Sequence, residues 1–162
     1  MAQLNGGEVL ARALVANEID IVFGIPGVQL DPFFAGLHDV REHIQIIHAR
    51  HEQGLALMAF GYTHVSGKMS VLAVVPGPGF LNAATSLLTA HACNTPLLCL
   101  AGQSEQQFIG AGFGVLHELD NQIGIARSFT KWAHRTEDTE TLVSDLAAAI
   151  TAVHTHRPRP VY

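Results

Sequence analysis

The hydrophobic residues of this chain fall into two kinds of segment that alternate along its length. Short apolar runs, rich in β-branched and aromatic residues and bounded by glycine or proline, are typical of strands. We expect such strands at residues 19–23, 44–47, 69–75, 97–101 and 129–133. Apolar residues at helical spacing predict helices at residues 7–16, 29–37, 52–65, 80–92, 116–126 and 141–155. Residues 102–114 hold four glycines and predict a loop.

The predicted strands read as largely apolar runs and show no regular alternation of polar and apolar residues. Strands of this kind, each followed by a helix, are typical of a parallel sheet that helices cover on both faces. We therefore expect an α/β fold with three layers, α/β/α, around a mainly parallel sheet of about six strands. No internal repeat or low-complexity linker divides residues 1–162, so a single domain is expected.

Composition and charge exclude several classes of function. The chain has 162 residues, of which 48% are hydrophobic and 14% charged, as suits one globular domain with a sizeable core. A net charge of −5 without any Lys/Arg-rich run argues against a nucleic-acid partner. No apolar stretch approaches a membrane span, and residues 1–7 lack the pattern of a secretory leader, so we expect a cytoplasmic protein with no membrane partner. Cys93 and Cys99 lack ligand-like spacing and are expected to be buried free thiols.

Three predicted strands end in turns with distinctive residues. These turns are Gly-Ile-Pro-Gly at 24–27, Arg-His-Glu at 50–52 and Val-Pro-Gly-Pro-Gly at 75–79. In open parallel sheets, ligands bind at the carboxyl ends of the strands, where such turns meet. Any sharp turn uses glycine and proline, so each turn taken alone is explained by chain geometry. Their combination predicts a shared binding rim.

Glu52 is the strongest candidate for chemistry in this chain. It follows the predicted strand 44–47 and starts the predicted helix 52–65, so its carboxyl group is expected at the rim. The structural explanation is that a carboxylate in the first helical turn is stabilised by roughly 0.3–1 kcal/mol through the helix dipole. The neighbouring turns favour a catalytic role instead.

Several familiar sites are absent from the sequence. The turn at 75–79 lacks the lysine of a phosphate-binding loop, and no GxGxxG fingerprint opens the first helix. His51 and Glu52 are followed by Leu55 where the zinc motif HExxH requires its second histidine, so no metal site is expected. There is also no GxSxG nucleophile elbow.

The composite pattern resembles the N-terminal pyrimidine-binding domain of thiamine-diphosphate-dependent enzymes. The matching segments are Gly-Ile-Pro-Gly at 24–27, Arg-His-Glu-Gln-Gly at 50–54, Gly-Tyr at 61–62, Gly-Pro-Gly-Phe-Leu-Asn at 77–82, Thr-Pro at 95–96, Gly-Gln at 102–103 and Phe-Thr-Lys-Trp-Ala at 129–133. The branch it is most similar to includes acetolactate synthase, benzaldehyde lyase and oxalyl-CoA decarboxylase. The resemblance implies the flavodoxin-like topology of that family and covers essentially the whole chain.

The resemblance implies a definite role for Glu52. In the family this glutamate hydrogen-bonds N1′ of the aminopyrimidine of thiamine diphosphate and favours the tautomer whose 4′-nitrogen deprotonates C2 of the thiazolium. The activated cofactor then adds to the carbonyl of a 2-oxo acid or an aldehyde. Such a carboxyl group must share a proton, and a site of low polarity would help it to do so.

The same resemblance assigns expected positions to other residues. Val75, Pro76 and Asn82 are expected near the aminopyrimidine ring, and Pro26 with Gly27 near the reacting centre. Gln29 and His117 are expected to face the substrate. His117 is equally well explained as a surface or otherwise satisfied histidine.

The family continues beyond a segment like residues 157–162 into a middle domain and a diphosphate-binding domain, neither of which is present in this chain. The latter holds Mg²⁺ and the cofactor's phosphates, so magnesium is expected only through that absent domain. We expect a piece of a larger homodimeric or tetrameric enzyme that is inactive alone. Two alternatives stay open: a natural separate subunit of a two-chain decarboxylase, and a non-enzymatic small-molecule-binding module.

Overall fold

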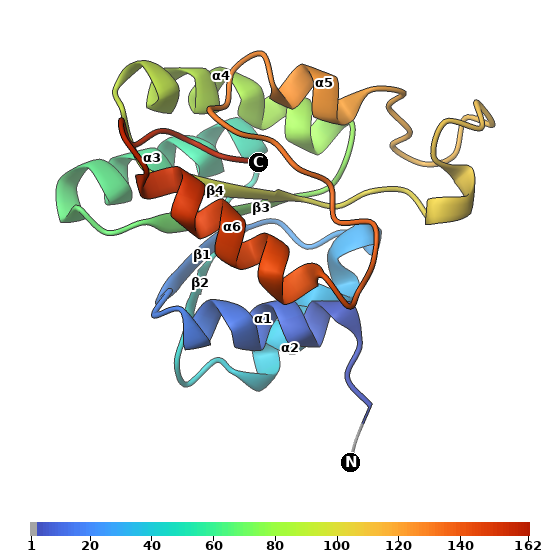
Figure 1. The fold of residues 1–162 in the computed structure, drawn as a ribbon, viewed down its shortest axis with the longest axis horizontal. Coiled ribbons are helices and arrows are strands. Elements are labelled where there is room, and N and C mark those ends of the chain that lie inside the picture. Colours follow the sequence, from blue (N-terminus) through green and yellow to red (C-terminus); the bar gives the residue numbers. More distant parts are fainter. Residues whose placement is uncertain (1–2) are drawn as a thin grey trace.

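A parallel sheet forms the centre of the computed structural model, which describes residues 3–162 (Figure 1). Its four strands lie in the order β2-β1-β3-β4 and all pair in parallel. Their bounds are β1 Ile21–Gly24, β2 Gln45–Ile47, β3 Ser70–Val74 and β4 Leu97–Ala101. The expected α/β architecture with a parallel sheet is confirmed.

Helices cover both faces of the sheet (Figure 1). On one face lie α1 Gly6–Ala16, α2 Asp31–Asp39 and α6 Leu142–His154, and on the other lie α3 Glu52–Ser66, α4 Pro78–Ala92 and α5 Gln122–Ala126. Two short 3₁₀ turns, η1 Val28–Leu30 and η2 Gln106–Phe108, interrupt the loops. Successive strand residues point to opposite faces, so Val71 and Ala73 pack under α1, α2 and α6 while Leu72 and Val74 pack under α3 and α4.

Local chemistry sets the helix ends that matter for the site. Asn5 and Glu8 form a reciprocal capping box at the start of α1. His51 caps α3, since its Nδ1 accepts the backbone N–H of Gln53 at 3.2 Å. Gly67 ends α3 with a φ of 72°, a left-handed conformation in which glycine carries no steric penalty. The start of α3 at Glu52 therefore agrees with the sequence-based expectation.

The expectation of about six strands is not confirmed. Beyond β4, Val161 forms single parallel bridges with Leu98 on one side and Trp132 on the other. Phe129 and Thr130 instead donate their backbone N–H groups to Ala126 at the end of α5. Because these residues turn with the helix, the predicted strand 129–133 contributes one bridge instead of a continuous ladder.

Three further expectations differ from the structure. The strand at 44–47 is not buried along its length, because β2 forms the edge of the sheet and Gln45 is exposed. The helix expected at 116–126 is confined to α5, since the Glu118 carboxylate binds the backbone N–H groups of Gly112 and Val115 in its own loop. Of the two free cysteines, Cys99 is buried but Cys93 is exposed at the end of α4.

Candidate active site

The turns after β1 and β3 meet at the carboxyl end of the sheet. A methyl group on Gly27 would lie 2.4 Å from Cγ1 of Val75, and one on Gly79 would lie 2.6 Å from Cγ2 of the same residue. Both glycines therefore allow the backbone to approach Val75 closely. Gly79 also connects this cluster to Glu52, because its added methyl would be 3.3 Å from Glu52 Oε1. The structure thus brings three separate strand ends onto one rim.

Glu52 is half-buried at the first position of α3 and faces the start of α4. Asn82, one turn into α4, donates its side-chain Nδ2–H to Glu52 Oε2 at 3.0 Å. The two residues are 30 positions apart in sequence and meet because α3 and α4 pack side by side. This bond orients the carboxylate through one oxygen and leaves Oε1 beside Gly79 at the rim.

The turn after β3 has an unusual backbone. Gly77 has φ 57° and ψ −112°, a combination that residues with a Cβ rarely adopt. A methyl group there would also meet the carbonyl oxygen of His117 at 2.6 Å. Pro76 is buried beside it, and Pro78 starts α4 at a position where a missing N–H costs nothing. This turn therefore depends on glycine for both conformation and space.

Gln29 and His117 lie on the other side of this turn. Gln29 Nε2 donates to the carbonyl oxygen of Leu116 at 3.1 Å. A methyl group on Gly102 would touch both Gln29 Cβ, at 3.0 Å, and Pro76 Cδ, at 3.1 Å. Within the described residues, Gln29 Oε1 and His117 Nδ1 are buried without a hydrogen-bond partner. Buried polar atoms of this kind are rare in folded proteins.

The predicted site residues are therefore brought to one edge, in two groups. Gly27, Val75, Glu52 and Asn82 form one group around the carboxylate. Pro76 packs toward Gly102 and Gln29, and His117 lies over Gly77. Pro26 is exposed in the turn after β1. These positions are observed, whereas the roles that the resemblance implies for the residues stay predictions.

Two contributors to the rim were missed by sequence reasoning. Gln122 is only 2% exposed, and its side chain accepts the backbone N–H of Gly77 at 2.8 Å. His48 Nδ1 lies 2.8 Å from the carbonyl oxygen of Gly24 and its ring packs near Phe34. Neither residue belongs to a motif that the sequence analysis singled out, because a single glutamine or histidine has no distinguishing local pattern.

The rim around Glu52 is open. A cavity of about 440 Å³ lies nearby, between α1, α6 and β4, and includes Gln29 and Gly102 in its lining. Glu52, Val75 and Asn82 lie outside that lining. The half-buried Glu52 carboxylate is therefore separate from this cavity.

Residues 3–162 contain no cluster of three or more His, Cys, Asp and Glu side chains suited to a metal ion. In the same range, no helix combines the length and the apolar character needed to cross a membrane.

Comparison with known protein families agrees with this geometry. The family described as "Thiamine pyrophosphate enzyme, N-terminal TPP binding domain" matches residues 4–125, which include α1 to α4 and most of α5. The chain belongs to this family, so the resemblance inferred from its motifs is confirmed. Thiamine diphosphate is the cofactor of that family.

Individual relatives extend the match over nearly the whole chain. A probable 2-ketoarginine decarboxylase of Pseudomonas aeruginosa is 37% identical over 159 residues, covering 98% of this chain and 28% of the relative. A probable acetolactate synthase large subunit of Methanococcus aeolicus is 35% identical over 161 residues, covering 98% of this chain and 26% of the relative. The large subunit of acetolactate synthase from Lactococcus lactis is 34% identical over 157 residues, covering 97% and 27%. The chain thus spans about a quarter of the length of these relatives.

Proposed function

We propose that this chain is the N-terminal, cofactor-activating domain of a thiamine-diphosphate-dependent 2-oxo acid decarboxylase or carboligase similar to acetolactate synthase. The observation that carries the proposal is the Glu52 carboxylate, held by Asn82 at the rim next to Gly79 and Val75. The relatives' names, a decarboxylase and several acetolactate synthases, support the class of reaction.

The residues present suit the aminopyrimidine end of the cofactor. Val75, Gly27 and Gly79 present an apolar surface without bulky side chains beside the carboxylate, which an aromatic ring can approach. Glu52 Oε2 is occupied by Asn82, so Oε1 is the oxygen available to a ring nitrogen. A carboxyl group paired with a ring in this way can share one proton with it.

When bound, the cofactor supplies a nucleophilic carbon that adds to the carbonyl of a 2-oxo acid or an aldehyde. In this chain, Glu52 holds or releases the proton at the ring nitrogen, and Asn82 keeps the carboxylate in one orientation. Gln29 and His117 offer the buried atoms Oε1 and Nδ1 to the substrate side of the rim. The chain's contribution is therefore orientation and proton sharing.

The proposal includes a composite active site. Glu52 lies on an open rim, so a second surface is needed to exclude water and to hold the diphosphate with Mg²⁺. We assign both tasks to a middle and a diphosphate-binding domain outside residues 1–162, and we infer that this domain alone is inactive. The match to only about a quarter of each relative's length supports this assignment.

Self-association is part of the same proposal. The outward faces of α3 and α4 carry large apolar side chains with substantial exposure: Leu57 46%, Met58 45%, Leu81 43% and Leu88 54%. Apolar groups gathered next to a functional rim are typical of a protein interface. We propose that a second copy covers them in a homodimer or tetramer. The cytoplasmic location stays a prediction.

The test is to express the complete gene product and measure its binding of thiamine diphosphate with Mg²⁺ by calorimetry. Carbon dioxide release from a panel of 2-oxo acids is then measured with and without the cofactor. We expect cofactor-dependent turnover in the complete protein and none in residues 1–162 alone. A gene that ends at codon 162 would favour a separate subunit, for which activity must appear on adding its partner chain. A complete protein that does not bind the cofactor would refute the proposal.

A further inference from the structure

Gln122 connects three separate segments at the rim through one buried amide group. Its Oε1 accepts the backbone N–H of Gly77 at 2.8 Å. Its Nε2 donates to the carbonyl oxygen of Gly102 at 3.1 Å and to the hydroxyl of Tyr162 at 2.7 Å. Burial raises the pKa of that hydroxyl, so Tyr162 stays neutral and accepts the bond. Of the three partners, Gly77 follows β3 and Gly102 follows β4. Tyr162 donates its backbone N–H to the carbonyl oxygen of Trp132.

The partners determine the orientation of the amide. The backbone N–H of Gly77 can only donate and the carbonyl of Gly102 can only accept, so Oε1 must face the first and Nε2 the second. Glutamate would supply the acceptor but, when ionised, no donor, and methionine would supply neither. Glutamine is therefore the side chain of this length that satisfies both backbone groups.

The segments joined in this way are those that carry the proposed cofactor contacts. Gly77 lies between Pro76 and Pro78 and has the positive φ described above. Its N–H has Gln122 Oε1 as its acceptor. Gly102 packs closely against Pro76 and Gln29, because a methyl group added to Gly102 would lie within 3.1 Å of both residues. A displacement of Gln122 would therefore remove one hydrogen bond on each side of Pro76, leaving the backbone bond from Gly102 to Val74.

We propose that Gln122 is a positioning residue that holds the Val75–Gly79 turn and Gly102 in the geometry required to bind the cofactor ring. This inference rests on the proposed function, because it takes that turn as part of the cofactor site. Gln122 itself acts through Gly77 and Gly102 and touches neither Glu52 nor Asn82.

The first test is amide hydrogen exchange in the 162-residue chain, which needs no cofactor. Gln122→Met removes the acceptor of the Gly77 N–H, so exchange of that amide should accelerate about tenfold. Gln122→Glu keeps an acceptor and should protect Gly77 better than methionine does; it also serves if the methionine variant does not fold. Gln107→Met, at an exposed glutamine in η2, is the matched control. Unchanged exchange at Gly77 in a folded Gln122→Met variant would overturn the inference.

The second test measures cofactor affinity in the complete protein. Gln122→Met should raise the thiamine diphosphate concentration for half-saturation about tenfold, while turnover at saturating cofactor stays within about twofold. Tyr162→Phe removes one partner of Nε2 and leaves the Gly77 contact, so its half-saturation should stay within about twofold of the wild type.

The outcomes separate the two proposals. If the wild type binds the cofactor and Gln122→Met binds it equally well, Gln122 is a structural residue only and this inference fails. If Tyr162→Phe is as impaired as Gln122→Met, the contact to Gly77 is not what matters and the inference also fails. If the wild type itself does not bind, the proposed function fails and the positioning role toward the cofactor fails with it.

Discussion

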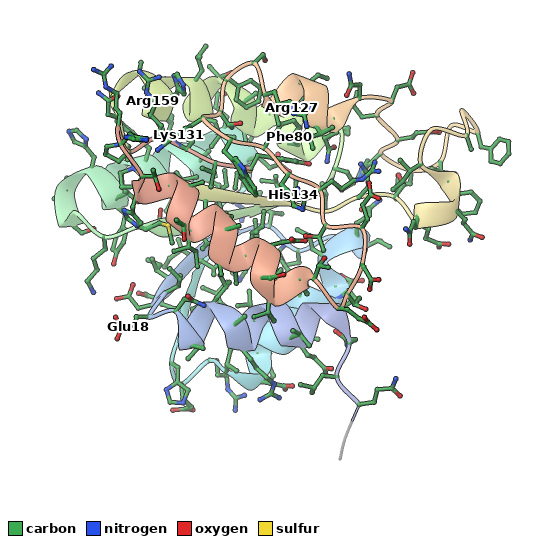
Figure 2. All side chains as sticks on the ribbon, in the orientation of Figure 1. Glu18, Phe80, Arg127, Lys131, His134 and Arg159 are labelled. Carbon is green, nitrogen blue, oxygen red and sulfur yellow. The ribbon has the colours of Figure 1, made fainter. Side chains whose placement is uncertain are left out.

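The two ends of the parallel sheet differ in the polar side chains that they hold. At the amino ends of the strands, charged groups are paired within the chain: Lys68 binds Asp20 at 2.5 Å, and Arg159 contacts His91 and Asn94. Lys131 donates to the carbonyl oxygens of Thr155 and Arg157 at the same end. Figure 2 shows Lys131 and Arg159 together, far from the loop that carries η2.

At the carboxyl ends, by contrast, several polar atoms are not used within the described chain. Gln29 Oε1 and His117 Nδ1 are buried without partners, and Glu52 keeps one oxygen beside Gly79. Burying a polar group without a hydrogen bond costs roughly 1–3 kcal/mol. Thr95 Oγ1, just before β4, carries the same cost at the amino end. What distinguishes the carboxyl end is that its unpartnered atoms lie next to the turn at Gly77 and to the free oxygen of Glu52.

The largest effect is expected from Glu52→Gln in the complete protein. Glutamine keeps the size and an acceptor for Asn82 but cannot take up a proton, so turnover should fall by about 10²–10⁴-fold. Glu18→Gln, at an exposed glutamate preceding β1 at the opposite end, should leave turnover unchanged. Thermal unfolding should be similar for both variants. Turnover of Glu52→Gln equal to that of the wild type would remove the catalytic assignment.

A large contrast is also expected between the two thiols of the native chain. Burial raises the pKa of Cys99 to about 12, so at neutral pH only roughly one molecule in 10⁵ carries the reactive thiolate. Cys93 is exposed at the amino-end side of β4. Brief treatment with iodoacetamide should add one group, at Cys93, and a second only after unfolding. If mass spectrometry finds both thiols alkylated in the native protein, that result would contradict the buried position of Cys99.

A moderate effect is expected from Gly27→Ala. The backbone at Gly27 is extended and tolerates any residue, but the new methyl group would lie 2.4 Å from Val75 Cγ1. Val75 must move, and we expect cofactor affinity in the complete protein to fall about tenfold, as for a core overpacked by one methyl group. Gly6→Ala is the control, because its methyl would meet Thr139 at an ordinary 3.5 Å. Equal affinity in both variants would show that Val75 is not near the cofactor.

The smallest effect is expected from Asp20→Asn at the amino end. The hydrogen bond from Lys68 holds the pKa of the Asp20 carboxyl below its usual 3.8. A carboxyl with a lower pKa in the folded state adds stability above pH 3.8, and this stability is lost as the pH falls through the folded-state pKa. Asp20→Asn should therefore unfold slightly more easily at neutral pH and match the wild type in strong acid, as urea titrations at both pH values would show. The effect is small because the pair is exposed.

The sequence alone determined the elements and the candidate residues of the site. The pattern of apolar residues identified α1, α3, α4, α6 and the four strands. A helix buries one face, which gives helical spacing, and a buried strand gives a short continuous apolar run. Glu52 was singled out because it lies between an apolar run and a helix, and the Gly/Pro turns because few other residues form them. These are local properties, readable from neighbours in sequence.

The tertiary structure alone decided which distant residues meet. Asn82 reaches Glu52 only because β3 inserts beside β1 and places α4 against α3. Gln122 bonds Gly77 across 45 positions, and a single bridge between Trp132 and Val161 replaces the strand expected at 129–133. The exposure of Cys93 likewise follows from its place at the end of α4. Such contacts depend on strand order and helix packing, which arise from the burial of the whole chain and leave no local pattern in sequence.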